Sequence, residues 1–261
     1  MDLGLKGKRV LVLASSKGLG KAAAEAYAKA GANVMLTSRT VKNVKQTAEN
    51  LSSFAEGTIA YHPCDVSKKE DIKKLIDETA ARFGGIDVLV NNAGGPPPGK
   101  FEDLDEEDWE WAYQLTLMST VRAIRYALPY LKQSKGRIVN ITSSSIKEPI
   151  DGLLLSNVYR MGIVGLAKTL SKELAPDGVL INTVGPGRID TERVRTLDAA
   201  KAEKMQLTPE EVREQSEAAI PLGRYGEPEE FANIILFLGS GLNTYVTGQM
   251  FVADGGMTHS Y

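Results

Sequence analysis

VLVLASSKGLG (residues 10–20) joins a short apolar run to a small polar turn and the first residues of a helical stretch. Gly18 and Gly20 carry no side chain, so the backbone there can approach a pyrophosphate closely. The phosphates would then lie on the unpaired N–H groups and the positive dipole end of the helix. A glycine pair alone is equally typical of a tight turn between a strand and a helix. Its place on the first strand, with a helix directly after it, favours a dinucleotide site.

Apolar runs and amphipathic stretches alternate outward from this segment along the whole chain. Strands are predicted at 9–14, 33–38, 58–62, 87–91, 137–142, 179–184 and 249–252, and helices at 19–30, 42–54, 69–83, about 105–131, 156–174 and 229–238. Gly31 is placed to end the first helix, and Pro129 to bend the end of the long one. Such repeated units predict an α/β fold, a Rossmann-type doubly wound parallel sheet of about seven strands with helices on both faces.

The organisation predicted is a single domain over residues 1–261, because no linker, repeat or low-complexity region divides the chain. The one Pro/Gly cluster, at 94–99, follows a strand inside a unit and is interpreted as a stiff loop. Residues 192–220 form a charged, helix-prone insertion before Pro221.

Composition argues against nucleic-acid-binding, membrane, secreted and metal-binding classes of protein. The 261 residues are 43% hydrophobic and carry a formal net charge of −2, so neither nucleic acid nor an anionic membrane is an expected partner. Residues 1–8 lack the apolar stretch of a signal peptide, and no run approaches the length of a membrane span. A single cysteine, Cys64, fits a reducing cytoplasm. His62 and His259 match no metal-ligand spacing, so no metal site is expected.

The second predicted strand ends in Thr37-Ser38-Arg39, where an NAD-preferring site would present a carboxylate to the ribose. Arg39 instead offers a guanidinium to a 2′-phosphate, and Lys17 in the turn offers a second cation. Each alone could be an ordinary surface charge. Together they predict NADP(H) in preference to NAD(H).

Several further motifs follow in order: Asp65-Val66, Asn91-Asn92-Ala93-Gly94, the segment 186–191 (PGRIDT), and a tail with 221–224, 226–230, 246–249 and 254–256. With residues 13–20, they resemble the short-chain dehydrogenase/reductase family, particularly its 3-oxoacyl-carrier-protein-reductase-like members, over almost the full length. Leu13 and Ala14 replace the first two signature residues of the family's loop. The resemblance implies cofactor contacts from Ala14, Ser16, Lys17, Gly18, Leu19, Gly20, Arg39, Asp65, Val66, Asn92, Ala93, Gly94, Pro186, Gly187, Ile189 and Thr191.

The catalytic centre departs from the family pattern of Asn, Ser, Tyr and, four residues after the Tyr, Lys. Counting from Trp109 puts Thr116 at the Asn position, and Ser143 keeps the Ser position. The Tyr and Lys positions carry Ser156 and Arg160. Tyr159 is not the direct equivalent of the family Tyr, because Ile163 stands four residues after it.

The predicted catalytic group is therefore Ser143, Ser156, Tyr159 and Arg160. Ser143 is expected to bind the substrate oxygen. Arg160 cannot copy a deprotonating Lys but could hold a ribose or stabilise an oxyanion. Tyr159 could act as a displaced acid, with Arg160 lowering its pKa, or could pack in a helix interface. Ser156 could take part in catalysis or fill vacated space.

Resemblance implies that residues 192–220 fold over the substrate as a lid. Arg188, Arg193 and Arg195 could attract an acidic or phosphorylated substrate, or form an ordinary solvated face. The resemblance also implies a homodimer or homotetramer, with contacts through 109–131 and 156–174.

The leading functional prediction is an NADP(H)-dependent oxidoreductase that acts on a carbonyl/alcohol pair of a small-molecule or acyl-type substrate with an atypical proton donor. A non-catalytic NADP(H)-binding sensor or scaffold, and alkene reduction or dehydration on the same scaffold, are the alternatives.

Overall fold

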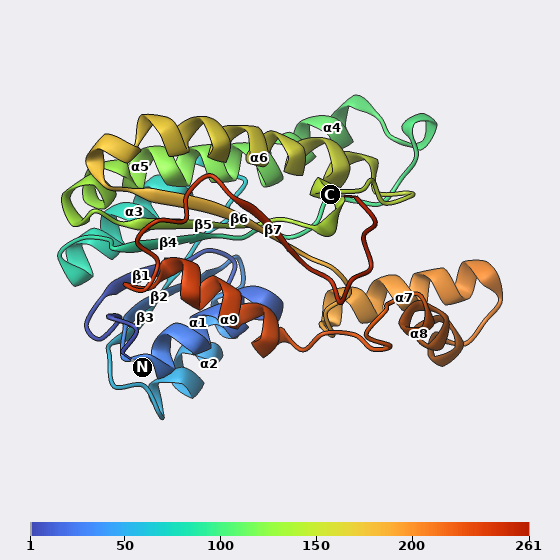
Figure 1. Cartoon of the computed structure of the whole chain (residues 1–261), viewed down its shortest axis with the longest axis horizontal. Coiled ribbons are helices and arrows are strands. Elements are labelled where there is room, and N and C mark those ends of the chain that lie inside the picture. Colours follow the sequence, from blue (N-terminus) through green and yellow to red (C-terminus); the bar gives the residue numbers. More distant parts are fainter. Residues whose placement is uncertain (1, 261) are drawn as a thin grey trace.

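The computed structural model describes residues 2–260, and within them the strands form one parallel seven-stranded sheet of order β3-β2-β1-β4-β5-β6-β7 (Figure 1). The strands are β1 (Arg9–Val12), β2 (Asn33–Ser38), β3 (Ile59–Pro63), β4 (Val88–Asn91), β5 (Arg137–Ile141), β6 (Leu180–Pro186) and β7 (Met250–Ala253). The order reverses between β1 and β4. In open parallel sheets, ligands bind at such a switch point, beyond the carboxyl ends of the strands.

The helices are α1 (Gly18–Lys29), α2 (Val41–Ser52), α3 (Lys69–Phe83), α4 (Glu106–Ala112), α5 (Ser119–Ser134), α6 (Leu154–Glu173), α7 (Glu192–Met205), α8 (Pro209–Ala218) and α9 (Pro228–Gly239). Figure 1 shows α1, α2 and α9 on one face of the sheet and α3, α5 and α6 on the other. No helix in residues 2–260 is both long enough and apolar enough to cross a membrane.

Two hydrophobic cores follow from the alternation of side chains along the strands. Val10 and Val12 face the core beneath α1 and α9, whereas Leu11 and Leu13 face the core beneath α3 and α5. Because both faces are covered, the central strands β1 and β4 are mostly apolar rather than alternating with polar residues. The predicted fold class is confirmed.

Backbone geometry explains where the predicted boundaries were wrong. The first strand ends at Val12 rather than at residue 14, because Ala14 has φ +47 and leaves the extended conformation. Gly31, with φ +79, follows α1 as expected. Pro129 lies inside α5, which continues to Ser134 and ends at the left-handed Lys135.

The long helix predicted at 105–131 is three segments in the structure. A π-helical stretch, Tyr113–Met118, separates α4 from α5. Such a stretch accommodates an extra residue in the turn and is frequent at functional sites. Thr116, at the position that the family pattern gives to Asn, lies within it.

The insertion at 192–220 folds into α7 and α8, which pack on each other. In Figure 1 they project beyond the carboxyl ends of the strands, next to the region where the site is expected. We call residues 192–220 the lid segment.

Candidate functional site

The turn between β1 and α1 fits a pyrophosphate. Gly18 has φ +57, a conformation that favours glycine. A Cβ on Gly20 would lie 2.5 Å from the Ala14 carbonyl oxygen and 2.6 Å from Asn92 Nδ2, so only glycine fits there. α1 begins with no side-chain cap and no acidic residue in its first turn, which leaves its first N–H groups to an anion.

Asn92 braces this turn from the neighbouring strand. Its Nδ2 donates to the carbonyl of Ala14 at 3.1 Å. The bond joins the end of β4 to the residue whose backbone is strained. Ala93 and Gly94 follow it at the same sheet edge, and Leu19 packs partly against the core below α1.

Both predicted cations lie at the turn between β1 and α1 and the neighbouring end of β2. Ser16 Oγ donates to Ser38 Oγ at 3.0 Å, which ties the turn to the end of β2. Arg39 is exposed directly after that strand. Lys17 is exposed too, but its Nζ lies 3.0 Å from Glu192 Oε2 at the start of α7. This pair could not be predicted from the spacing of the residues, because its members are far apart in the chain.

Asp65 and Val66 lie where β3 leads into α3. Asp65 Oδ1 accepts hydrogen bonds from the backbone N–H and the hydroxyl of Ser67, at 3.1 and 2.7 Å. Val66 is buried in the core beneath α3. The pair therefore fixes the turn at the adenine side of the groove.

Residues 186–191 bring the sheet, the turn and the lid segment together. A Cβ on Gly187 would lie 2.5 Å from Asp254 Cβ, so the chain passes close to the segment after β7. Pro186 ends β6, and Ile189 is buried. Thr191 Oγ1 accepts from the N–H of Val194 at 3.4 Å and so caps α7. Its methyl group faces Gly18 across the groove, 3.9 Å from where a Cβ on that glycine would lie.

Three of the four predicted catalytic residues gather beyond β5. Ser143 follows the strand, and its Oγ accepts from the N–H of Ser145 at 3.2 Å. Arg160 Nε donates to Ser156 Oγ at 3.0 Å, and Arg160 Nη1 donates to the carbonyl of Ile141 at 3.4 Å. Ser156 and Arg160 are one helical turn apart on α6, which makes this bond possible.

The Arg160 side chain is buried without a carboxylate partner among the described residues, and Arg160 is 8% exposed. Burial lowers the pKa of its guanidinium to about 10, and the positive charge of Arg193 is the smaller contributor to this shift. Arginine is ordinarily too basic to lose its proton. Here the pKa equals the ordinary value of a tyrosine phenol.

Tyr159 lies outside this group. Its hydroxyl donates to the carbonyl of Trp109 at 3.1 Å. Its ring packs edge-on against Trp109 and tilted against Tyr113, each with centroids 5.9 Å apart. Burial raises the pKa of Tyr159, and the charges of Glu110 and Tyr113 add to this. The expectation that Arg160 lowers the pKa of Tyr159 is therefore wrong, and the side chain packs in the interface between α6 and α4.

Thr116 does not supply the polar group of the family's Asn to a neighbouring side chain. Its hydroxyl is buried and has no hydrogen-bond partner in residues 2–260. Its carbonyl accepts from the hydroxyls of Ser119 and Thr120, at 3.2 and 3.3 Å, as the π-helical stretch ends. The π-helical stretch Tyr113–Met118 is thus present, although Thr116 stands where the family pattern has Asn.

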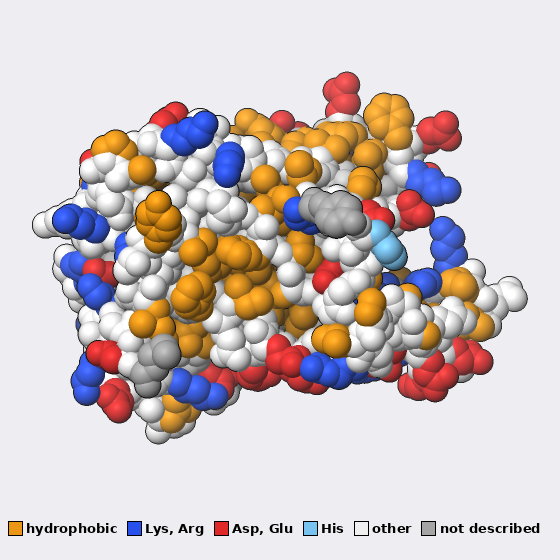
Figure 2. Space-filling view, viewed as in Figure 1, with side chains coloured by type: hydrophobic (Ala, Val, Ile, Leu, Met, Phe, Trp, Pro, Cys, Tyr) orange, Lys and Arg blue, Asp and Glu red, His pale blue; other side chains and the backbone are white. Residues whose placement is uncertain are grey.

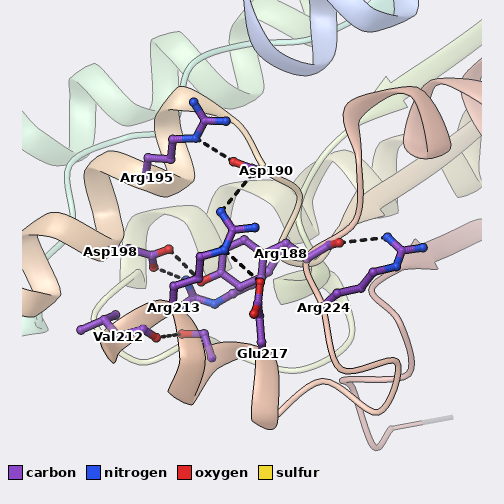
Figure 3. Close-up of polar contacts among 10 residues, drawn as sticks. Arg188, Asp190, Arg195, Asp198, Val212, Arg213, Glu217 and Arg224 are labelled. Carbon is purple, nitrogen blue, oxygen red and sulfur yellow. Dashed lines mark hydrogen bonds and ion pairs between the residues drawn. The ribbon is translucent and has the colours of Figure 1, made fainter. Parts of the chain in front are cut away.

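Two of the three arginines considered for acidic substrates are already neutralised (Figure 3). Arg188 pairs with the buried carboxylate of Asp198, and Arg195 pairs with Asp190 at 2.7 Å. The exception is Arg193, whose Nη2 donates to the carbonyl of Pro96 at 3.3 Å.

The same network fixes the lid segment to the body. Asp190 also pairs with Arg213 of α8, at 3.1 Å, and Tyr225 Oη donates to Asp198 Oδ2 at 2.7 Å. The guanidinium of Arg213 stacks 4.7 Å above the Tyr225 ring. Neither Asp198 nor Tyr225 was singled out from the sequence, because nothing in the spacing shows that they meet.

Residues 2–260 contain no group of three or more His, Cys, Asp or Glu side chains placed to hold a metal ion.

Comparisons with known proteins agree with this geometry. A family model described as "Enoyl-(Acyl carrier protein) reductase" matches residues 13–258. The 3-oxoacyl-[acyl-carrier-protein] reductase FabG of Aquifex aeolicus is 36% identical, over 98% of this chain and 100% of its own. The L-sorbose reductase of Gluconobacter frateurii, solved with NADPH and L-sorbose, has a TM-score of 0.95 and 28% identity, and the match covers 100% of both chains. YwfH, an NADPH-dependent reductase involved in bacilysin biosynthesis, has a TM-score of 0.93 and 28% identity, over 98% of this chain and 100% of its own.

A strained phosphate turn at the switch point, a serine beyond β5 and full-length similarity to reductases lead to one assignment: this chain belongs to the short-chain dehydrogenase/reductase family of oxidoreductases.

Proposed function

We propose that this protein is an NADP(H)-dependent reductase of carbonyl compounds in which Arg160 takes over the work of the absent Tyr and Lys. The observation that carries the proposal is the Arg160 guanidinium. It is buried, donates to Ser156 and to the carbonyl of Ile141, two residues before Ser143, and has no carboxylate partner in residues 2–260. Similarity to the Aquifex FabG and to structures solved with NADPH supports the reaction class.

The cofactor would lie along the carboxyl edge of the sheet, over the Gly18–Gly20 turn and the 186–191 segment, and supplies a hydride when bound. The buried approach of Gly20 to Ala14 and the uncapped start of α1 fit its pyrophosphate. Arg39 and Lys17 would bind a 2′-phosphate, which favours NADP(H) over NAD(H).

The residues of the chain act on the substrate oxygen. Ser143 would donate a hydrogen bond to it. Arg160 would stabilise the negative charge that develops on it, which is worth more in a buried site than in water. A pKa of about 10 also allows an Arg160 N–H to give up its proton to the new alkoxide, and solvent then restores it. Ser156 accepts from Nε and so orients the guanidinium.

Substitution of Arg160 tests the proposal. Arg160→Gln should lower kcat for ketone reduction by about 100- to 1,000-fold, the effect of removing one oxyanion donor. NADPH binding, followed by its fluorescence, should change far less. Lys172→Gln, which removes an exposed cation from the same helix, is the matched control. A kcat of Arg160→Gln within twofold of the unmodified protein would refute the proposal.

The pH profile gives a second readout. The acid must be protonated to act, so the reduction rate should fall as the pH rises through about 10. In Arg160→Lys the fall should begin at lower pH, because an ammonium starts from a lower pKa than a guanidinium and burial lowers it again.

Reduction of a conjugated alkene is the second candidate. The matching family model is described as an enoyl reductase, and an enolate oxygen needs a fixed cation more than it needs a phenol. Assays with a crotonyl and an acetoacetyl thioester, followed by product identification, separate the two reactions. A saturated acyl product from the crotonyl thioester, with no reduction of the acetoacetyl thioester, would favour alkene reduction.

We also propose a cytoplasmic single-domain protein that forms a homodimer or homotetramer. Exposed apolar side chains on α4 and α6, namely Trp111, Val158 and Met161, support contacts through these helices. Light scattering after size-exclusion chromatography tests the assembly, and a monomeric mass would refute it.

A further inference from the structure

Arg193 is the arginine of the lid segment that no carboxylate neutralises in residues 2–260. Its neighbours Arg188 and Arg195 pair with Asp198 and Asp190. Arg193, the second residue of α7, makes no ion pair within the described part of the chain, and its hydrogen bond to Pro96 is to a neutral carbonyl. A guanidinium that donates to a single carbonyl still has unused N–H donors.

Its position places these donors at the substrate side of the site. The Arg193 guanidinium lies 3.2 Å from where a side chain on Gly95 would begin, so it rests against the loop that follows β4. Gly99 N donates to the carbonyl of Gly152 at 2.8 Å, which ties that loop to the segment leading into α6. The side chain of Arg193 thus connects the lid segment to the loop after β4. That loop is bonded in turn to the residues that lead into α6, the helix of Ser156 and Arg160. Figure 2 shows an opening between the α7–α8 unit and the body, with Lys and Arg side chains gathered near it.

Arg193 and Arg160 therefore lie near enough for one cation to act on the other, and neither pairs with a carboxylate in the described residues. The charge of Arg193 acts on Arg160 strongly enough to lower its pKa, and no carboxylate acts in the opposite direction. A buried cation without a counter-ion is costly, and a second cation nearby increases the cost. An anionic ligand would replace this repulsion with attraction.

We propose that Arg193 is a specificity-determining residue that binds a carboxylate of the substrate, so that the substrate is a small keto acid with its carbonyl at Ser143 and Arg160. The inference rests on the proposed reductase function. A planar guanidinium matches a carboxylate through two parallel hydrogen bonds, which a neutral ester cannot provide. The carbonyl of Pro96, which accepts from Arg193 Nη2, holds the guanidinium in place.

The test uses pairs of compounds that differ only in this charge. Acetoacetate and 4-oxopentanoate are compared with their methyl esters, as ligands in calorimetry with NADP-saturated protein and as substrates with NADPH. Both acids are used because they place the carboxylate at different distances from the carbonyl. At least one acid should be preferred to its ester by roughly 10- to 100-fold, the effect of a charge-assisted hydrogen bond.

Variants then assign the preference to one side chain. In Arg193→Gln the ratio of acid to ester should fall by the same roughly 10- to 100-fold, and Arg193→Lys should restore part of it. Lys201→Gln, which removes an exposed cation from the same helix, should leave the ratio unchanged.

Each outcome decides the inference. Equal binding of acids and esters overturns it. A loss of NADPH affinity in Arg193→Gln equal to the loss of acid affinity also overturns it, because Arg193 would then hold a cofactor phosphate. Binding of an acid through Arg193 without turnover supports the inference and refutes the reductase proposal. Arg160-dependent reduction of neutral ketones with no preference for acids refutes the inference and supports the reductase proposal.

Discussion

Asp198→Asn should loosen the lid segment while leaving the sheet intact. The Asp198 carboxylate is 5% exposed and accepts from Tyr225 Oη at 2.7 Å and from Arg188. Asparagine keeps the shape and one acceptor oxygen but removes the charge. Because one oxygen remains for these two donors, one bond is lost and the other loses its charged acceptor, at a cost of about 1 kcal/mol each. Arg188 loses its counter-ion as well, a smaller cost because its side chain is 30% exposed.

The expected total is about 2–3 kcal/mol, which lowers the Tm by about 5–10 °C if the network opens only with global unfolding. If the lid segment opens locally, hydrogen exchange should accelerate in α7 and α8 while β1, β4 and β5 stay protected. KM should rise in either case, since Arg193 lies on the lid segment and Asp190 holds that segment through Arg195 and Arg213. Asp177→Asn breaks an exposed pair with Lys132 at 2.8 Å and serves as the control, expected to cost less than about 1 kcal/mol. The reasoning is refuted if both variants lose the same stability and exchange identically.

Three further substitutions test single contacts. Tyr159→Phe removes the bond to Trp109 and should cost about 1 kcal/mol in chemical denaturation with little change in kcat; a 100-fold loss of kcat would make Tyr159 the proton donor after all. Glu192→Gln frees Lys17 and should tighten NADPH binding by up to about fivefold in a fluorescence titration, with NADH unchanged, since exposed pairs contribute at most about 1 kcal/mol. Ala14→Gly relieves a left-handed φ of +47 and should raise the Tm by about 2–4 °C in scanning calorimetry; a lower Tm would mean that the Ala14 backbone is not strained.

The sheet and the phosphate turn could be predicted from the sequence because both follow from local patterns. Apolar runs of strand length alternate with helical stretches. Gly18, with a left-handed φ, and Gly20, where no side chain fits, mark the turn between β1 and α1. The boundaries were less accurate where a single residue changed conformation, as at Ala14 and in the π-helical stretch around Thr116.

The centre of the site was harder to predict because side chains on one helix turn point in different directions. Ser156, Tyr159 and Arg160 were predicted as members of one catalytic group. A helix turns by about 100° per residue, so Tyr159 and Arg160 lie on opposite flanks of Ser156. Arg160 reaches the end of β5, whereas Tyr159 reaches Trp109 on α4.

Ion pairing in the lid segment could not be predicted from the sequence, because the partners come from separate elements. Arg188, Arg193 and Arg195 are indistinguishable by spacing. Only the folded chain shows that the first and third meet Asp198 and Asp190 while Arg193 meets a carbonyl.

This uneven pairing bears on how new specificities could arise in this scaffold. Arg188, Arg195 and Arg213 each anchor the fold through a carboxylate, so replacing any of them disturbs the architecture. Arg193 pairs with no carboxylate in the described residues, so most other side chains at this position should leave the surrounding structure folded. Selection, natural or in the laboratory, therefore has one freely adjustable position above a rigid frame, and a library randomised at Arg193 should yield folded proteins with altered preferences.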